Sequence, residues 1–195
     1  MTIQIAPVTG AGLAEALPAL ARLRITVFRD FPYLYDGDEA YESAYLAGFA
    51  ASEGAVIVVA RDGAGIVGAA TAAPLAAQDA AWQQPLVAAG FDLARTFYFG
   101  ESVLLDGYRG QGIGHGFFDH REAQARAHGA SHAAFCSVIR PEDHPARPEG
   151  YRPLDAFWRG RGYAPLAGVT ATFDWKTVES AEEEPHQLQY WTRGL

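Results

Sequence analysis

Residues 108–114 read Tyr-Arg-Gly-Gln-Gly-Ile-Gly and separate a run typical of a strand, 96–105, from a run typical of a helix, 113–128. The three glycines in this stretch permit a sharp turn and carry no Cβ that would obstruct a ligand. The first amides of the following helix lack intrahelical partners and lie at the positive end of its dipole. Strand, turn and helix N-terminus therefore predict an anion cradle suited to phosphate or pyrophosphate, with Arg109 adding charge at its rim.

Two familiar phosphate-binding loops do not fit this spacing. A P-loop needs Lys and then Ser or Thr after its last glycine, but Gly112 is followed by Ile113. A dinucleotide fingerprint that starts at Gly110 would need its third glycine where His115 stands. Spacing alone leaves two interpretations, a phosphate cradle or a plain tight turn, because glycine-rich turns between strand and helix are common.

The stretch Arg-Gly-Gln-Gly-Ile-Gly fits the pattern Q/R-x-x-G-x-G/A and so resembles the signature of the GNAT superfamily of N-acetyltransferases. The resemblance is strongest over residues 96–163 and extends more weakly to the order of elements in the whole chain. It implies that acetyl-coenzyme A is the co-substrate and that its pyrophosphate is held by Arg109, Gly110, Gln111, Gly112, Ile113 and Gly114. It also implies that the backbone of the preceding strand pairs with the pantetheine arm at Val103, Leu104 and Leu105, where one amide can face the thioester oxygen.

Length and hydrophobic content predict one domain, residues 1–195. The resemblance implies that this domain has a GNAT-like α/β (α+β) fold. We expect a mixed, mostly antiparallel twisted sheet of about seven strands flanked by about four helices. The expected strands are 3–8, 55–61, 66–73, 96–105, 131–139, 169–176 and 187–192. The expected helices are 11–29, 39–51, 113–128 and 153–160, with a short helical insertion at 78–90.

Composition excludes several classes of protein. The net charge of −8 argues against a nucleic-acid surface, and no apolar run is long enough to cross a membrane. The single cysteine, Cys136, and a start without a signal peptide favour the cytoplasm. The histidine pairs 115/120 and 128/132 lack a third ligand, so we expect no metal. A homodimer is possible if the last strand pairs with its copy in a second chain, but the sequence leaves the oligomeric state open.

Acetyl transfer to an amine requires a group that removes a proton from the attacking nitrogen. Regular alternation along 96–105 places Glu101 on the same face as Phe99 and Val103, where a carboxylate must be paired or used. Glu101 is therefore the first candidate for the base, and the alternative is that it pairs with an arginine or caps a neighbouring backbone. His144 is the second candidate, although a loop histidine is usually only solvated; a chain of waters is a third route.

The departing thiolate needs a proton, and many GNAT proteins supply it from a tyrosine in the pattern Tyr-x-x-x-Gly-Phe. Counting back from Gly162-Tyr163, that position holds Trp158, whose indole is not a usable acid at neutral pH. Tyr151, at the start of the same helical segment, is the candidate replacement. The thiolate can also leave unassisted, because the pKa of a thiol is modest.

The acceptor is expected to be a small-molecule amine or a peptide or protein amino group. Tyr33, Tyr35 and Asp36 can offer rings and a carboxylate to such an amine, together with Trp158. The plain alternative is a packed turn in which Asp38 caps the helix 39–51. The proline-rich loop 140–151 is a second place where the acceptor can be chosen.

These patterns favour an acetyl-CoA-dependent N-acetyltransferase. The alternative is a non-catalytic CoA-binding regulatory module, which the tryptophan at position 158 favours. A third interpretation is a nucleotide-binding protein with an unusual loop. The sequence does not identify the acceptor.

Overall fold

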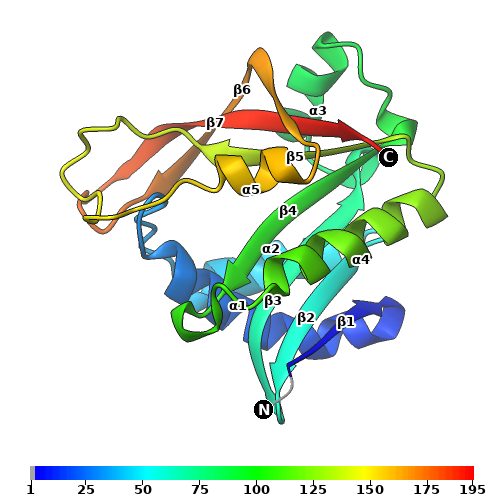
Figure 1. Cartoon of the computed structure of the whole chain (residues 1–195), viewed down its shortest axis with the longest axis horizontal. Coiled ribbons are helices and arrows are strands. Elements are labelled where there is room, and N and C mark those ends of the chain that lie inside the picture. The colour runs from blue at the N-terminus through cyan, green and yellow to red at the C-terminus, as the bar shows by residue number, and fades with distance from the viewer. Residues whose placement is uncertain (1–2) are drawn as a thin grey trace.

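A computed structural model describes residues 3–195, in which seven strands form one sheet in the order β1-β2-β3-β4-β5-β7-β6 (Figure 1). β4 and β5 are parallel, and every other neighbouring pair is antiparallel. The predicted mixed, mostly antiparallel sheet is therefore confirmed. The strands are β1 (Gln4–Thr9), β2 (Val56–Asp62), β3 (Gly65–Pro74), β4 (Thr96–Leu104), β5 (His132–Val138), β6 (Ala164–Lys176) and β7 (Glu183–Gly194).

Five α-helices accompany these strands in the described part of the chain, one more than the sequence indicated as regular elements. The additional helix is α3, which corresponds to the predicted short insertion. Asp38 caps α2 as expected, because its Oδ1 accepts hydrogen bonds from the amides of Ala40 and Tyr41 at 2.8 and 2.9 Å. The helices are α1 (Leu13–Phe28), α2 (Glu39–Ala50), α3 (Ala80–Ala88), α4 (Ile113–Ala127) and α5 (Asp155–Gly160).

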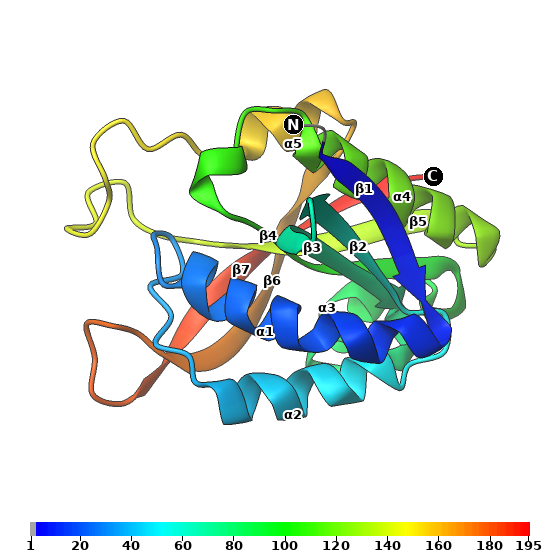
Figure 2. The same ribbon diagram turned by 90° about the horizontal axis from the view of Figure 1, so that it is seen from below.

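Helices cover both faces of the sheet (Figure 2). α1 and α2 lie on one face, where Leu20 and Leu46 pack with Ile57 of β2. α4 and α5 lie on the other face, where Phe117 packs with Phe99 of β4. Full burial of such a side chain contributes roughly 1.5–3 kcal/mol, so both layers hold the sheet in place.

The last strand, β7, lies inside the sheet and pairs with β5 on one side and β6 on the other. The expectation that the last strand pairs across a dimer is therefore wrong, because both of its edges are occupied within the chain. The edge strands of the described sheet are β1 and β6.

A bulge interrupts β4 in the middle of the sheet. Ser102 pairs with Ala70 and Phe99 pairs with Ala72, so Gly100 and Glu101 both lie opposite Thr71. Such an extra residue reverses the alternation of side chains beyond it. Glycine is required at position 100, because a Cβ there would lie 2.4 Å from Thr71 Oγ1.

Because of the bulge, Glu101 does not lie on the same face of the sheet as Phe99. Phe99 packs on the α4 side of the sheet, whereas Val103 packs on the α1 and α2 side. Glu101 points to the same side as Val103 and reaches Arg24 of α1. The prediction that Phe99, Glu101 and Val103 share one face is wrong, because regular alternation does not continue through a bulge.

β4 and β5 pair only where Thr96, Phe97 and Tyr98 meet His132, Ala133 and Ala134. Beyond these positions β4 continues to Leu104 and β5 to Val138, and the two strands diverge (Figure 1). Within residues 3–195 no strand pairs with the facing edges of the diverging segments. Backbone donors and acceptors in the middle of a sheet require partners, so the diverging segments present main-chain groups with which a ligand can pair.

Candidate active site

β4 leads through a 3₁₀ turn, Asp106–Tyr108, into the glycine-rich stretch that precedes α4. Gly110 and Gly112 have φ angles of 74° and 81°, in the left-handed region that favours glycine. A Cβ added at either residue would meet no atom within 4 Å, so the space beside this backbone is open. Gly112 is the N-cap of α4, and the first turn of that helix carries no acidic residue. The predicted cradle therefore presents main-chain amides to open space at a helix N-terminus.

Side chains around the cradle hold the turn and leave its amides exposed. The Tyr108 hydroxyl donates to Asp62 Oδ2 at 2.9 Å, which ties the turn to the β2–β3 hairpin. Gln111 Nε2 donates to the carbonyl of Gly107 at 3.1 Å. The Arg109 side chain is 54% exposed, and its Nε lies 3.5 Å from Asp106 Oδ1. A surface pair of this kind is weak, so the Arg109 guanidinium is available to an incoming anion.

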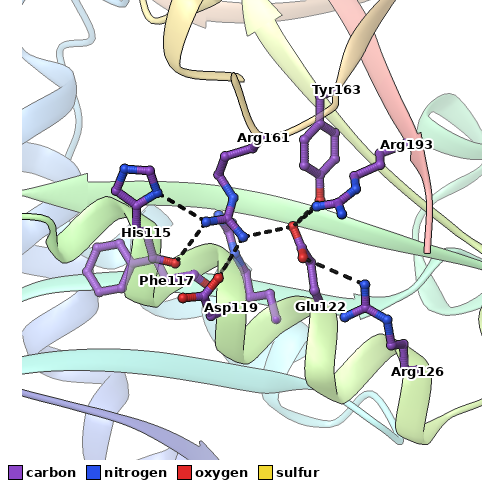
Figure 3. Close-up of polar contacts among 9 residues, drawn as sticks. His115, Phe117, Asp119, Glu122, Arg126, Arg161, Tyr163 and Arg193 are labelled. Atoms are coloured by element: carbon purple, nitrogen blue, oxygen red, sulfur yellow. Dashed lines mark hydrogen bonds and ion pairs between the residues drawn. The ribbon is translucent and has the colours of Figure 1, made fainter. Parts of the chain in front are cut away.

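A buried network fixes α4 to the elements on the far side of the strand divergence (Figure 3). Glu122 of α4 accepts hydrogen bonds from Arg161 Nη2 at 3.2 Å and from Arg193 Nη1 of β7 at 3.0 Å. The Tyr163 hydroxyl donates to the same carboxylate at 3.2 Å, and Arg161 also donates to Asp119 at 2.7 Å. Since Glu122 is 4% exposed, this shared carboxylate ties α4 firmly to β7 and the end of α5.

The amide directions along β4 distinguish the residues that the sequence assigned to the pantetheine arm. The amide of Leu105 donates to the carbonyl of Val67 at 3.0 Å, on the β3 side. Backbone groups alternate in direction along a strand, so the amide of Leu104 faces the open edge toward β5. Val103 is completely buried, with its side chain toward α1 and α2. Of these three residues, Leu104 offers a free donor to a ligand between the strands.

Glu101 lies in a buried ion-pair cluster on the α1 and α2 side of β4. Its Oε2 accepts a hydrogen bond from Arg24 Nη1 at 2.6 Å, and Arg24 Nε donates to Glu42 Oε2. Burial by itself lowers the pKa of Arg24, but Glu101, Tyr45 and Glu42 raise that pKa above its ordinary value. The pairing with an arginine, which the sequence left open, is therefore present. It leaves Glu101 Oε1 buried and without a partner among residues 3–195.

Arg121 of α4 fastens the bulge from the opposite side of the sheet. Its Nη1 donates to the main-chain carbonyls of Thr71 at 3.4 Å and Glu101 at 3.3 Å. The guanidinium carbon lies 4.6 Å from the ring centroids of both Phe99 and Phe118. Burial lowers the pKa of Arg121 to about 10, so it stays charged at neutral pH. The bulge that aims Glu101 is thus held by the helix that starts at the cradle.

Tyr33 and Tyr35, predicted to contact the acceptor, lie beside this cluster. The Tyr33 ring stacks on Phe28 of α1 at 4.2 Å. Burial raises the pKa of Tyr33, and Cys136 of β5 adds to the shift. Burial and then Glu42 raise the pKa of Tyr35.

Asp36 and Trp158, the other residues predicted to contact the acceptor, lie elsewhere. Lys176 Nζ is 2.9 Å from Asp36 Oδ2, and this contact is the main reason that the pKa of Asp36 is lowered. Trp158 packs on the other face of the sheet, with ring centroids 5.1 Å from Phe135 and 5.0 Å from Trp191. Tyr33 and Tyr35 therefore lie near the cluster of Arg24, Glu42 and Glu101, whereas Asp36 and Trp158 do not.

The two segments expected to choose the acceptor meet in space. Arg140 donates from Nε to the carbonyl of Pro32 at 2.8 Å and from Nη2 to that of Tyr33 at 3.1 Å. Phe31 packs against Tyr151 and His144, with ring centroids 4.8 and 5.7 Å away. The loop 140–151 thus covers the connection between α1 and α2. Tyr151 and His144, the other catalytic candidates, lie on this cover, and burial raises the pKa of Tyr151.

Sequence reasoning missed Arg24, Glu42 and Arg121, although the helical periodicity held a signal for each. Arg24 stands next to Leu23 in the buried stripe of α1. Glu42 stands four residues before Leu46, and these two are the buried residues of α2. Arg121 follows Phe117 by four residues on the inner face of α4. A charged residue at an apolar position of a helix indicates a buried ion pair or a site.

Two further features bear on function. Within residues 3–195, no group of three or more His, Cys, Asp or Glu side chains is arranged to hold a metal ion. No helix in the same range has the length and apolar character needed to cross a bilayer.

Comparison with known proteins identifies the fold. No protein-family model matches the chain, and no curated protein matches it. An acetyltransferase from Thermus thermophilus is similar, with a TM-score of 0.60, 14% identity and coverage of 100% of this chain and 98% of the other. A ribosomal-protein-alanine N-acetyltransferase from Brucella melitensis gives 0.63 and 16%, with 100% of each chain covered.

A third similar structure, from Salmonella typhimurium, was solved with its cofactor acetyl-CoA. It has a TM-score of 0.60 and 12% identity, and the match covers 100% of this chain and 95% of the other. Identities at this level establish the fold alone. The GNAT-like fold predicted from the glycine-rich stretch is therefore confirmed.

Proposed function

We propose that this chain, which has the fold of the GNAT superfamily, is an acetyl-CoA-dependent N-acetyltransferase that acts as a single domain. The observation that carries the proposal is the divergence of β4 and β5 directly before an open glycine turn at the N-terminus of α4. One arrangement thus offers edge amides to an extended arm and helix amides to a diphosphate. The similar structures named acetyltransferases, and the one solved with acetyl-CoA, support this assignment.

Cofactor binding in this proposal relies on the main chain. The amides at Gly112 to Gly114 and the Arg109 guanidinium hold the diphosphate. The open edge of β4 pairs with the pantetheine amides, and the Leu104 amide faces the thioester oxygen as charge develops there. Bound acetyl-CoA supplies the activated acyl group.

The chemistry requires a neutral amine, which Glu101 generates. The acceptor approaches from the α1 and α2 side, where Tyr33 and Tyr35 lie beside the carboxylate. Glu101 Oε1 has no partner among the described residues and accepts the proton as the nitrogen attacks. Trp158 packs in the aromatic layer between Phe135 and Trp191 and supplies no acid. The thiolate leaves without a dedicated acid, because the pKa of a thiol is modest.

The acceptor in this proposal is a primary amine, either a small molecule or a peptide or protein amino group. The chain between α1 and α2 and the loop 140–151 enclose the side from which it enters. The alternative function is a non-catalytic acyl-CoA-binding module, which the tryptophan in place of the usual tyrosine favours.

Two measurements separate these functions. Calorimetry with acetyl-CoA tests the cradle, and release of free CoA thiol in the presence of a panel of amines tests transfer. Binding together with amine-dependent thiol release supports the enzyme. Binding without release from any amine favours the regulatory module, and no binding of acetyl-CoA contradicts both.

A further inference from the structure

Three elements bring together a buried cluster whose charges do not balance. Arg24 of α1 lies between Glu42 of α2 and Glu101 of β4, and it contacts both carboxylates. The side chains of Arg24, Glu42 and Glu101 are 13%, 0% and 5% exposed, respectively. Two ionised carboxylates and one guanidinium carry a net charge of −1. Uncompensated buried charge is costly, so this cluster favours the gain of one positive charge.

Both carboxylates also have hydrogen-bonding capacity to spare. Oε1 of Glu42 and Oε1 of Glu101 are buried and have no hydrogen-bond partner among the described residues. Buried carboxylate oxygens normally accept a hydrogen bond, so two that have no partner indicate that a proton or a donor can bind here. A proton satisfies such an oxygen and removes the excess negative charge in one step.

Charged and titratable groups face Glu101 from every side that packs on it. Arg24 comes from α1, Glu42 and Tyr45 from α2, and Tyr33 and Tyr35 from the connection between them, with Tyr35 acting on Glu42 and Arg24. Arg121 of α4 binds the main-chain carbonyl of Glu101. Among these groups Glu42 is the one that competes with Glu101 for the charge of Arg24.

We propose that Glu42 is a positioning residue that keeps Glu101 able to accept a proton during acetyl transfer. An arginine paired with Glu101 alone would stabilise its carboxylate form and make it a poor base. By sharing Arg24, Glu42 weakens that stabilisation. This inference rests on the proposed function and adds a second carboxylate to it.

The step balances in atoms and charge. The N–H bond of the acceptor ammonium breaks and an O–H bond forms at Glu101 Oε1. The nitrogen lone pair forms the C–N bond to the acyl carbon, and the C–S bond breaks with its electron pair on sulfur. A second N–H bond breaks as the amide forms, and that proton goes to the thiolate. The proton on Glu101 then passes to water. The acceptor class that follows is an amine that arrives as a cation, since a neutral or anionic acceptor leaves the negative cluster unbalanced.

The test removes the charge of Glu42 and keeps its shape. Glu42→Gln can still accept a hydrogen bond from Arg24, so the geometry is retained. We expect the acid limb of the kcat/KM profile to move to lower pH by on the order of one unit and kcat to fall roughly tenfold. Glu42→Asp should restore much of the original profile. Glu39→Gln, which removes a charge from an exposed position on the same helix, is the matched control and should leave the profile in place.

A second measurement does not depend on turnover. Carboxyl carbon NMR, with the Glu101 signal assigned by its loss in Glu101→Gln, follows protonation of Glu101 directly. Its titration midpoint should be lower in Glu42→Gln than in the wild type. An unchanged midpoint, or a rate loss in Glu42→Gln without any change in the pH profile, overturns the proposal. Failure of the proposed function would instead appear as an absence of thiol release in the wild type, whatever the titration gives.

Discussion

Gly112 is the residue of the proposed diphosphate site whose role depends on the absence of a side chain. Its left-handed backbone starts α4, and the space where a Cβ would lie is open. We place the diphosphate of acetyl-CoA beside this backbone, so a side chain there would compete with the ligand for the same volume.

The first prediction concerns Gly112→Val. The branched side chain should weaken acetyl-CoA binding at least tenfold, about 1.4 kcal/mol, because it occupies the position of a phosphate. Calorimetry on the folded variant measures this. Gly63→Val is the control, since Gly63 also has a positive φ and open space but lies in the β2–β3 hairpin. Equal affinity in Gly112→Val and the wild type would place the cradle elsewhere.

The second prediction concerns Glu101→Gln. An amide can keep the hydrogen bond from Arg24 but cannot accept a proton, so the rate should fall by about two to four orders of magnitude. The acid limb of the pH profile should disappear with it, while acetyl-CoA affinity stays within about twofold. Thiol-release assays and calorimetry across pH measure the rate and the affinity. A variant with the wild-type profile would remove Glu101 as the base.

At the scale of elements, the bulge in β4 decides which side of the sheet receives the carboxylate. Arg121 holds the bulge through two main-chain carbonyls, and its own helix begins at the cradle. The glycine-rich turn and the Glu101 carboxylate are thereby parts of one rigid connection across β4.

The third prediction concerns Arg121→Met, which removes the donor and leaves two buried carbonyls without it. Each unsatisfied group costs about 1–3 kcal/mol, so the free energy of unfolding should fall by several kcal/mol. Urea denaturation measures this. Arg126→Met, further along α4 and 48% exposed, should change stability by less than about 1 kcal/mol. Similar losses in both variants would mean that the bulge does not depend on Arg121.

Elements with strong local signals were predictable from the sequence. The glycine spacing located the turn before α4, and Asp38 identified the start of α2. The bulge was not predictable, because Gly100 reads as one more residue of a regular strand. β6 begins at Ala164, before the predicted start at residue 169, since its pairing with β7 continues past an irregularity between Pro165 and Thr170.

The candidate site was predictable only in part for a related reason. Glu101 was recognised as an anomalous buried carboxylate, but its partner Arg24 lies 77 residues away. Glu42 joins the cluster through Arg24 across 18 residues. Contacts between distant segments depend on how the helices pack on the sheet, and no local pattern records that packing.

At the scale of the whole molecule, the C-terminal strands clamp the connection between α1 and α2. His186 of β7 is 6% exposed, with Nδ1 3.1 Å from Arg140 Nη1 and Nε2 3.2 Å from the carbonyl of Trp175. The neutral ring fits both contacts, with Nδ1 accepting and Nε2 donating. Burial lowers the pKa of His186, and protonation would place a second cation against Arg140.

The fourth prediction is a pH dependence of stability. Because the pKa of His186 is lower in the folded chain, the unfolded chain binds more protons as the pH falls below about 6.5. The contribution of the neutral ring is complete above that pH and is lost as the pH falls through the folded pKa. Urea unfolding between pH 7 and pH 5 should show this loss. His186→Gln should reduce the slope and His120→Gln should not; equal slopes in all three proteins would contradict it.

The separation of β4 from β5 has a mechanical consequence. Three residue pairs hold the two half-sheets together, and the shared Glu122 carboxylate braces them from α4. An extended molecule bound in the gap would add main-chain pairing between β4 and β5 along the segments that, within residues 3–195, do not pair with each other. A ligand bound between β4 and β5 would then make the whole sheet more rigid. Backbone amide hydrogens along the facing edges of β4 and β5 should therefore exchange far more slowly in the complex than in the free protein.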